Sequence, residues 1–144
     1  MFSKACEYAI RASIFIAKNS LEGQLVSPKK ISEEINSPPA FTAKILQALV
    51  KNNVIKSVKG AHGGFKIEKE DVSKVKLIQI VQAIDGDKTF KGCALGLEKC
   101  DEQQPCPLHT KFKDIRIDLR DMLEHTNLKE LALDLKSGSA FLKI

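Results

Sequence analysis

Three cysteines and one histidine that could bind a metal lie close together, at Cys93, Cys100, Cys106 and His109. Their spacing is Cys-x6-Cys-x5-Cys-x2-His, and the fourth cysteine of the chain, Cys6, is far away in the sequence. Thiolate sulfur and imidazole nitrogen are the ligand atoms that zinc and iron–sulfur clusters take from proteins. The residues between the cysteines include a charged run, glycine and proline, so this loop has little apolar material for a core of its own. We therefore expect a metal centre to hold the loop.

The spacing leaves the kind of centre open. Structural zinc sites usually pair their ligands as Cys-x2–4-Cys, and here only the step from Cys106 to His109 is that short. The wider gaps suit an iron–sulfur cluster, and a thiol redox switch is a third reading. A cysteine nucleophile is disfavoured, because the cysteines are grouped together rather than combined with a separated histidine and asparagine. We therefore predict that the chain is not an enzyme.

The positive charge of the chain is concentrated in one stretch. Residues 26–66 contain seven lysines and two glutamates, which accounts for the whole net charge of +5. A basic excess confined to one module is typical of a protein that binds a polyanion such as DNA, although a solvated lysine-rich face has the same composition. The length of 144 residues and the hydrophobic fraction of 43% predict one folded domain with an appended element at most.

The basic stretch has the pattern of a helix-turn-helix. After a first helix over 3–20, a second helix begins at Ser27 and Pro28, which suit the N-cap and the first helical position. A third helix follows a tight turn, with Ser37 expected as its cap. Its apolar residues recur at helical spacing and form a rear face, which leaves Thr42 and Lys44 in front. We therefore predict that this third helix reads DNA.

A β-hairpin directly after these helices predicts a wing. A β-branched run over 54–58 and a returning run over 65–67 flank a glycine-rich turn that also carries Lys59 and His62. Wings of this kind commonly contact phosphates or the minor groove. The candidate DNA-binding residues are Lys29, Lys30, Pro38, Pro39, Thr42, Lys44, Lys59, Gly60, His62, Gly63 and Lys66.

Beyond the wing we expect a helix over 74–84, the cysteine loop, and a long helix over 108–125. The long helix has apolar residues at alternating steps of four and three, which is the a/d seam of a helix that pairs with another helix. Alternatively, this helix is amphipathic and packs with its apolar side against its own domain. The candidate dimerisation residues are Leu108, Phe112, Ile115, Leu119 and Met122. The predicted fold is thus mainly α with a small β-hairpin wing. We expect a winged helix-turn-helix domain (1–86), a cysteine-rich loop (87–107), a dimerisation helix with a short last helix (108–136) and a tail (137–144).

Four segments together resemble the IscR/NsrR family of bacterial iron–sulfur winged-helix transcriptional regulators. The resemblance extends from Ser3 to about Leu135. The segments are Glu7-Tyr8-Ala9-Ile10-Arg11, the wing from Ser57 to Phe65, Ile80-Val81-Gln82-Ala83-Ile84-Asp85-Gly86, and Cys106-Pro107-Leu108-His109. Two positions depart from the family pattern, since Lys59 stands where arginine is frequent and Pro38-Pro39 open the third helix where relatives often have hydrogen-bonding residues.

This resemblance implies a homodimer that binds double-stranded promoter DNA and carries one cluster per subunit. It implies Cys93, Cys100 and Cys106 as cluster ligands, with His109 as the fourth ligand of a [2Fe–2S] site. In relatives with a [4Fe–4S] cluster an acidic residue of the partner's first helix serves instead, and Glu7 of the partner subunit would be its counterpart. We favour [2Fe–2S] over [4Fe–4S].

We expect a cytoplasmic protein that does not enter a membrane, because the sequence shows neither a signal-peptide pattern nor an apolar run of membrane-spanning length. Two other functions stay open. One is a zinc-stabilised or thiol-sensing regulator with the same DNA reader. The other is an electron-transfer protein with the same cluster, which would not need the basic helix-turn-helix.

Overall fold

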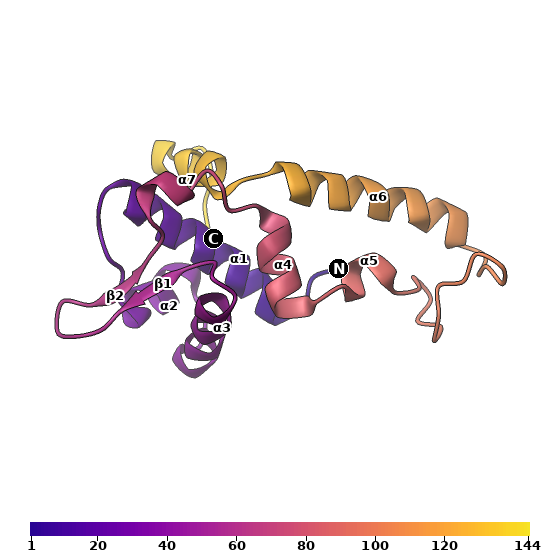
Figure 1. The fold of residues 1–144 in the computed structure, drawn as a ribbon, viewed down its shortest axis with the longest axis horizontal. Coiled ribbons are helices and arrows are strands. Elements are labelled where there is room, and N and C mark those ends of the chain that lie inside the picture. The colour runs from indigo at the N-terminus through magenta and orange to yellow at the C-terminus, as the bar shows by residue number, and fades with distance from the viewer.

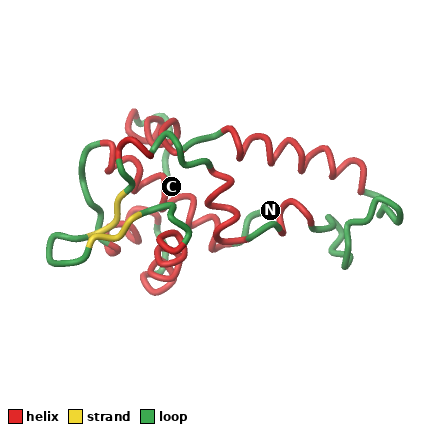
Figure 2. The backbone as a smooth tube through the Cα atoms, viewed as in Figure 1, coloured by secondary structure: helices red, strands yellow, loops and turns green.

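A computed structural model describes all 144 residues and confirms a mainly α fold with one small hairpin (Figure 1, Figure 2). The two strands pair antiparallel, with Ser57 opposite Phe65. In chain order the elements are α1 (Lys4–Leu21), α2 (Pro28–Ile35), α3 (Pro39–Lys51), β1 (Lys56–Val58), β2 (Gly64–Lys66), a 3₁₀ turn η1 (Lys69–Asp71), α4 (Leu77–Asp85), α5 (Lys88–Lys91), α6 (His109–His125) and α7 (Leu128–Ser137).

Helix α1 is the centre of the core and contacts α2, α3, α4 and α7. Its buried face carries small residues, including Ala9, Ala12 and Ala17, which let the neighbouring helices approach closely. Cys6 is fully buried on this face, as expected for a small hydrophobic residue. The start of α1 is fixed by Ser3, whose Oγ accepts a hydrogen bond from the Cys6 N–H and whose own N–H donates to Asp85.

The helix-turn-helix differs from the expectation at the start of α3. Helix α2 begins at the predicted Ser27 cap, whose Oγ accepts from the Lys30 N–H at 3.2 Å. Pro38, rather than Ser37, is the N-cap of α3, and it offers no side-chain hydrogen bond. The Ser37 hydroxyl instead bonds inside the turn to the hydroxyl of Thr42. Ser37 lies one residue too early to cap the helix, and it is buried.

The hairpin is anchored to the body by the segment that leads into α2. Val26 donates to the Phe65 carbonyl at 3.1 Å, and Phe65 donates to the Val26 carbonyl at 2.8 Å. The first strand is shorter than expected, because Val54 and Ile55 are buried in the core and pairing begins only at Lys56. The wing is therefore a short ribbon whose base is held beside α2.

The predicted helix over 74–84 begins only at Leu77. Lys76, just before it, is extended and forms a bridge with Asn127. The Leu77 N–H donates to the Thr126 carbonyl and the Leu128 N–H donates to the Val75 carbonyl, both at 3.0 Å. This pairing ties the link between α6 and α7 to the body. Helix α6 contacts only α4 and α5 extensively, and it extends away from the other helices (Figure 1). None of the helices combines the length and the apolar character that crossing a membrane requires.

Candidate DNA-binding surface and cysteine site

Thr42 does not lie on the exposed face of α3, where the sequence pattern places it. Thr42 is 1% exposed, and its Oγ1 donates to the Pro38 carbonyl at 2.9 Å. The structure therefore corrects the assignment of Thr42 as a candidate base contact, because its polar atoms are used inside the turn. The exposed residues in the first nine positions of α3 are Pro39, Ala40, Ala43, Lys44 and Gln47. Gln47 was missed, although its spacing of three and four from Lys44 and Ala43 places it on the same helical face.

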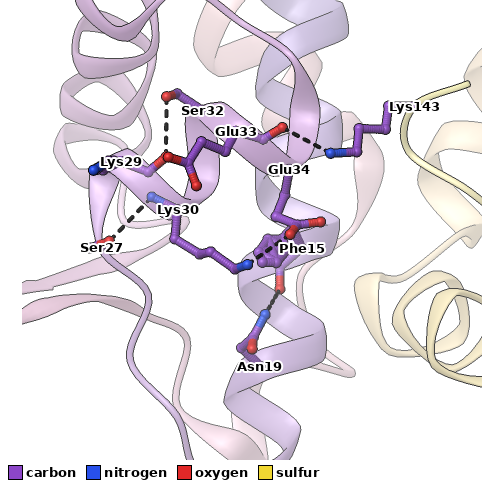
Figure 3. Close-up of polar contacts among 9 residues, drawn as sticks. All are labelled: Phe15, Asn19, Ser27, Lys29, Lys30, Ser32, Glu33, Glu34 and Lys143. Carbon is purple, nitrogen blue, oxygen red and sulfur yellow. Dashed lines mark hydrogen bonds and ion pairs between the residues drawn. The ribbon is translucent and has the colours of Figure 1, made fainter.

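On α2 one of the two candidate lysines is engaged within its own helix (Figure 3). Lys30 Nζ lies 2.9 Å from Glu34 Oε1. This hydrogen bond raises the pKa of Lys30 and lowers the pKa of Glu34. Lys29 is exposed and has no such carboxylate partner. Behind α2, the C-terminal segment contacts the same helix, since Lys143 Nζ donates to the Glu33 carbonyl at 3.3 Å.

The wing tip presents Lys59, Gly60 and His62 to solvent. Lys66, at its base, is half-buried and lies 3.1 Å from Glu68, and the hydrogen bond from Lys66 lowers the pKa of Glu68. Of the two candidate lysines of the wing, Lys59 has no carboxylate partner, whereas Lys66 is paired with Glu68. Gly63 closes the turn, because its N–H donates to the Gly60 carbonyl at 3.0 Å.

The cysteine loop lies at the end of the molecule opposite the wing, between α5 and the start of α6 (Figure 1). All its cysteines are free thiols. His109 is the first residue of α6 and is 9% exposed, and its Nδ1 lies 3.4 Å from Cys100 Sγ. The Arg116 guanidinium approaches the same sulfur at 3.1 Å. Cys100 is therefore held against the side of α6.

The other two cysteines form a separate pair. The N–H groups of Leu97 and Leu95 lower the pKa of Cys93, with a smaller contribution from a hydrogen bond that the Cys106 thiol donates. The Leu95 nitrogen is 3.4 Å from Cys93 Sγ. The four predicted ligands are thus present at one end of the molecule as two pairs, Cys100 with His109 and Cys93 with Cys106.

Nowhere in the chain do three such side chains converge as they would around a single ion. Glu7 is exposed in the first turn of α1, where its carboxylate pairs with Lys4 at 3.2 Å, and it does not join the cysteines of its own chain. The donor set of three thiols and one imidazole nevertheless fits the ligand chemistry of an iron–sulfur cluster or of zinc. Assembly of one centre would require the two pairs to move together.

The predicted seam of α6 is largely open to solvent. Leu108, Ile115 and Met122 are 42%, 52% and 46% exposed, and Phe112 and Leu119 are half-buried. Ile117, which is off the seam, is 56% exposed. Leu123 is the only aliphatic residue of this helix that is fully buried. A continuous apolar stripe on a helix that extends from the body is typical of an interaction surface.

Comparisons with known proteins agree with this fold. The family model Rrf2, described as iron-dependent transcriptional regulators, matches residues 2–134. An HTH-type transcriptional regulator of Aquifex aeolicus is 31% identical over 133 residues, which cover 91% of this chain and 90% of that protein. The regulator IscR of Pectobacterium atrosepticum is 28% identical over 124 residues, covering 86% of this chain and 74% of IscR.

Solved structures show the same fold. The structure of CymR, the global cysteine regulator of B. subtilis, has a TM-score of 0.73 at 21% identity and covers 92% of this chain and 95% of CymR. The structure of T. potens IscR has a TM-score of 0.71 at 18% identity and covers 97% of this chain and 91% of that one.

Proposed function

The chain belongs to the Rrf2 family of transcriptional regulators, and from this premise we propose that it is a homodimer whose promoter binding is controlled by an iron–sulfur cluster. The family and the relatives are regulators of transcription and not enzymes. The observation that carries the proposal is the gathering of three thiols and His109 at the free end of α6, far from the wing.

In the proposed complex α3 enters the major groove and the wing reaches the backbone. Lys29, Lys44 and Lys59 supply phosphate contacts, because their charges are exposed and free of carboxylate partners. Gln47 offers an amide that can pair bidentately with adenine, and Ala43 offers a methyl group for thymine. Pro38 and Pro39 pre-set the backbone at the start of the helix.

Cys93, Cys100, Cys106 and His109 are the proposed ligands of the cluster, with [2Fe–2S] favoured because a histidine completes the set. Glu7 of the partner subunit is the alternative fourth ligand for [4Fe–4S]. When bound, the cluster would supply a redox-active and labile centre. The protein residues contribute a loop that is tied to α6 through Cys100 and His109. Drawing the Cys93–Cys106 pair toward them would change how the loop sits on α6.

The seam of α6 is the proposed dimer contact, and it connects the cluster site to DNA binding. Two chains paired along α6 would present two α3 helices to successive major grooves. The cluster can act as a switch only if the cluster-bound and cluster-free dimers differ in their affinity for DNA.

The test begins with protein purified without oxygen, by absorption spectroscopy together with iron, sulfide and zinc analysis. Equal amounts of iron and sulfide, with a visible band that Cys100→Ala abolishes, support the proposal. Cluster-bound and cluster-free protein are then compared on duplexes of about 30 bp selected from a random pool, long enough for two half-sites. Equal affinity of the two forms would reject control by a cluster, and a colourless protein with one zinc per chain would reject the cluster itself.

A second candidate is a regulator that senses thiol oxidation without a cluster. The observation that favours it is the Cys93–Cys106 pair, because a thiol with a lowered pKa beside a second thiol favours disulfide formation. Mild oxidation of cluster-free protein, followed by peptide mass analysis, tests it. A disulfide linking these two residues that also changes DNA affinity would support this candidate, and oxidation without effect on DNA affinity would reject it.

A further inference from the structure

Arg116 joins three parts of the molecule that are separate in the sequence. Its Nη1 donates to the Gly92 carbonyl at 2.6 Å, and its Nη2 donates to Cys100 Sγ at 3.1 Å. Its guanidinium carbon lies 5.7 Å from the centre of the Phe112 ring. Gly92 is where the cysteine loop leaves α5, Cys100 is in the middle of the loop, and Phe112 is on the proposed seam of α6.

No other charged residue of α6 is placed in this way. Lys113 pairs only with Glu102 of the loop, at the surface. Arg120 pairs with Glu124 on its own helix at 2.8 Å and lies over the Phe90 ring of α5. A planar guanidinium can donate to a carbonyl and a sulfur at the same time while it lies over an aromatic ring. A lysine at this position would reach one partner and not both.

We propose that Arg116 is a positioning residue for the cysteine site. It fastens the segment from Gly92 to Cys100 onto α6 in the cluster-free protein. The part of this inference that concerns a cluster rests on the proposed function. In the cluster-bound protein, Arg116 supplies a positively charged hydrogen-bond donor to one sulfur ligand, Cys100. Hydrogen bonds to the sulfurs and nearby positive charge are among the factors that set the reduction potential of a cluster. The contact with Phe112 brings the same residue to the dimer seam.

The first test uses cluster-free protein and the substitutions Arg116→Gln and Arg116→Lys. We expect ¹⁵N relaxation to show an ordered loop segment in the wild type, with order parameters near about 0.85 for residues 92–100 and below about 0.6 in Arg116→Gln. The matched control is Arg120→Gln, which removes a guanidinium one turn further along α6 that lies over Phe90 of α5 and contacts neither Gly92 nor Cys100. Unchanged order parameters in Arg116→Gln would overturn the proposal.

The second test uses cluster-bound protein and redox titration of the visible band. Removing a cationic donor from the sulfur disfavours the reduced, more negative cluster, so Arg116→Gln should shift the midpoint potential to a more negative value. Arg116→Lys keeps the positive charge but loses the planar guanidinium, so its midpoint potential should lie between those of the wild type and Arg116→Gln. Arg120→Gln should have the midpoint potential of the wild type. An unchanged midpoint potential in Arg116→Gln would show that Arg116 does not influence the cluster through Cys100 Sγ. If the wild type takes up no cluster, the proposed function fails, while the relaxation experiment still decides the role of Arg116.

Discussion

The hydroxyls of Ser37 and Thr42 are hydrogen-bonded to each other inside the turn of the helix-turn-helix. The Thr42 hydroxyl and N–H both donate to the Pro38 carbonyl, each at 2.9 Å. One buried threonine therefore ties the first turn of α3 to Ser37 and Pro38, although α3 has no side-chain cap. The consequence is that α3 exposes a different set of residues than the sequence pattern indicates.

Thr42→Val should lower stability without changing which DNA is bound. The substitution keeps the shape but removes the hydroxyl and leaves Ser37 buried without its partner, which costs about 1–3 kcal/mol. Chemical denaturation measures this loss. Gln47→Ala is the counterpart, and it should leave stability within about 0.5 kcal/mol while relaxing sequence preference at one base pair. A changed preference in Thr42→Val would show that this threonine does face the DNA.

Lys59→Ala should weaken DNA binding on all sequences alike and reduce the slope of log K against log salt by about 1, because one phosphate contact is lost. Lys66→Ala should have a smaller effect, since Lys66 is already paired with Glu68. Fluorescence anisotropy titrations at several salt concentrations measure both. Lys136→Ala on α7 is the control, and a slope that is the same in Lys59→Ala and this control would remove Lys59 from the contact surface.

Gly64→Ala should destabilise the protein more than Gly60→Ala. Both glycines have positive φ, +153° and +108°, so both substitutions strain the backbone by about 1 kcal/mol. A Cβ on Gly64 would in addition lie 2.6 Å from the Val26 carbonyl oxygen, whereas a Cβ on Gly60 would meet open space. Thermal unfolding of the two variants measures the difference. Equal losses would mean that the wing is not held against Val26.

Stability should fall at high pH because of Cys6. Burial, with a further contribution from the Asp85 carboxylate, raises the pKa of the Cys6 thiol from its ordinary value near 9.0 to about 12. The folded protein keeps this proton while the unfolded chain releases it, so the contribution to stability is complete below pH 9 and is lost as the pH rises toward 12.

Comparison with Cys6→Ala isolates this group, since all other side chains are the same in both proteins. We expect the wild type to lose about 1.4 kcal/mol per pH unit more than the variant between pH 9.5 and 11 in urea unfolding, the free energy of one pKa unit. Parallel pH dependence of the two proteins would contradict the assignment.

Ile115→Glu should give a monomer, and Ile117→Glu should not. The two isoleucines are similarly exposed, 52% and 56%, but two positions along a helix turn the side chain to a different face, and only Ile115 is on the seam. A charge buried in the seam would prevent association. Sedimentation equilibrium measures the outcome. Monomers from Ile117→Glu with dimers from Ile115→Glu would place the interface on the other face of α6.

Several features of this protein followed from the sequence because they depend on neighbours a few residues away. Helical spacing of apolar residues predicted α1, α2, α3 and α6, and the glycine-rich turn predicted the hairpin, since periodicity and turn chemistry act over one to two turns of chain. The cluster of lysines and the Cys/His spacing can likewise be counted along the chain. These local signals were enough for the fold class and for the family.

The tertiary structure decided what depends on residues distant in the sequence. Helix α4 begins at Leu77, later than predicted, because residues 75–77 pair with residues 126–128, which are 51 positions away in the sequence at the bridge between Lys76 and Asn127. Arg116 meets Gly92 and Cys100 only because α6 folds back beside the loop. Thr42 is hidden because the turn at Ser37 directs it inward. The order of the residues therefore sets which chemical groups are available, whereas packing sets which partners these groups meet. Helical periodicity shows which residues share a face of a helix, but it does not show what covers that face.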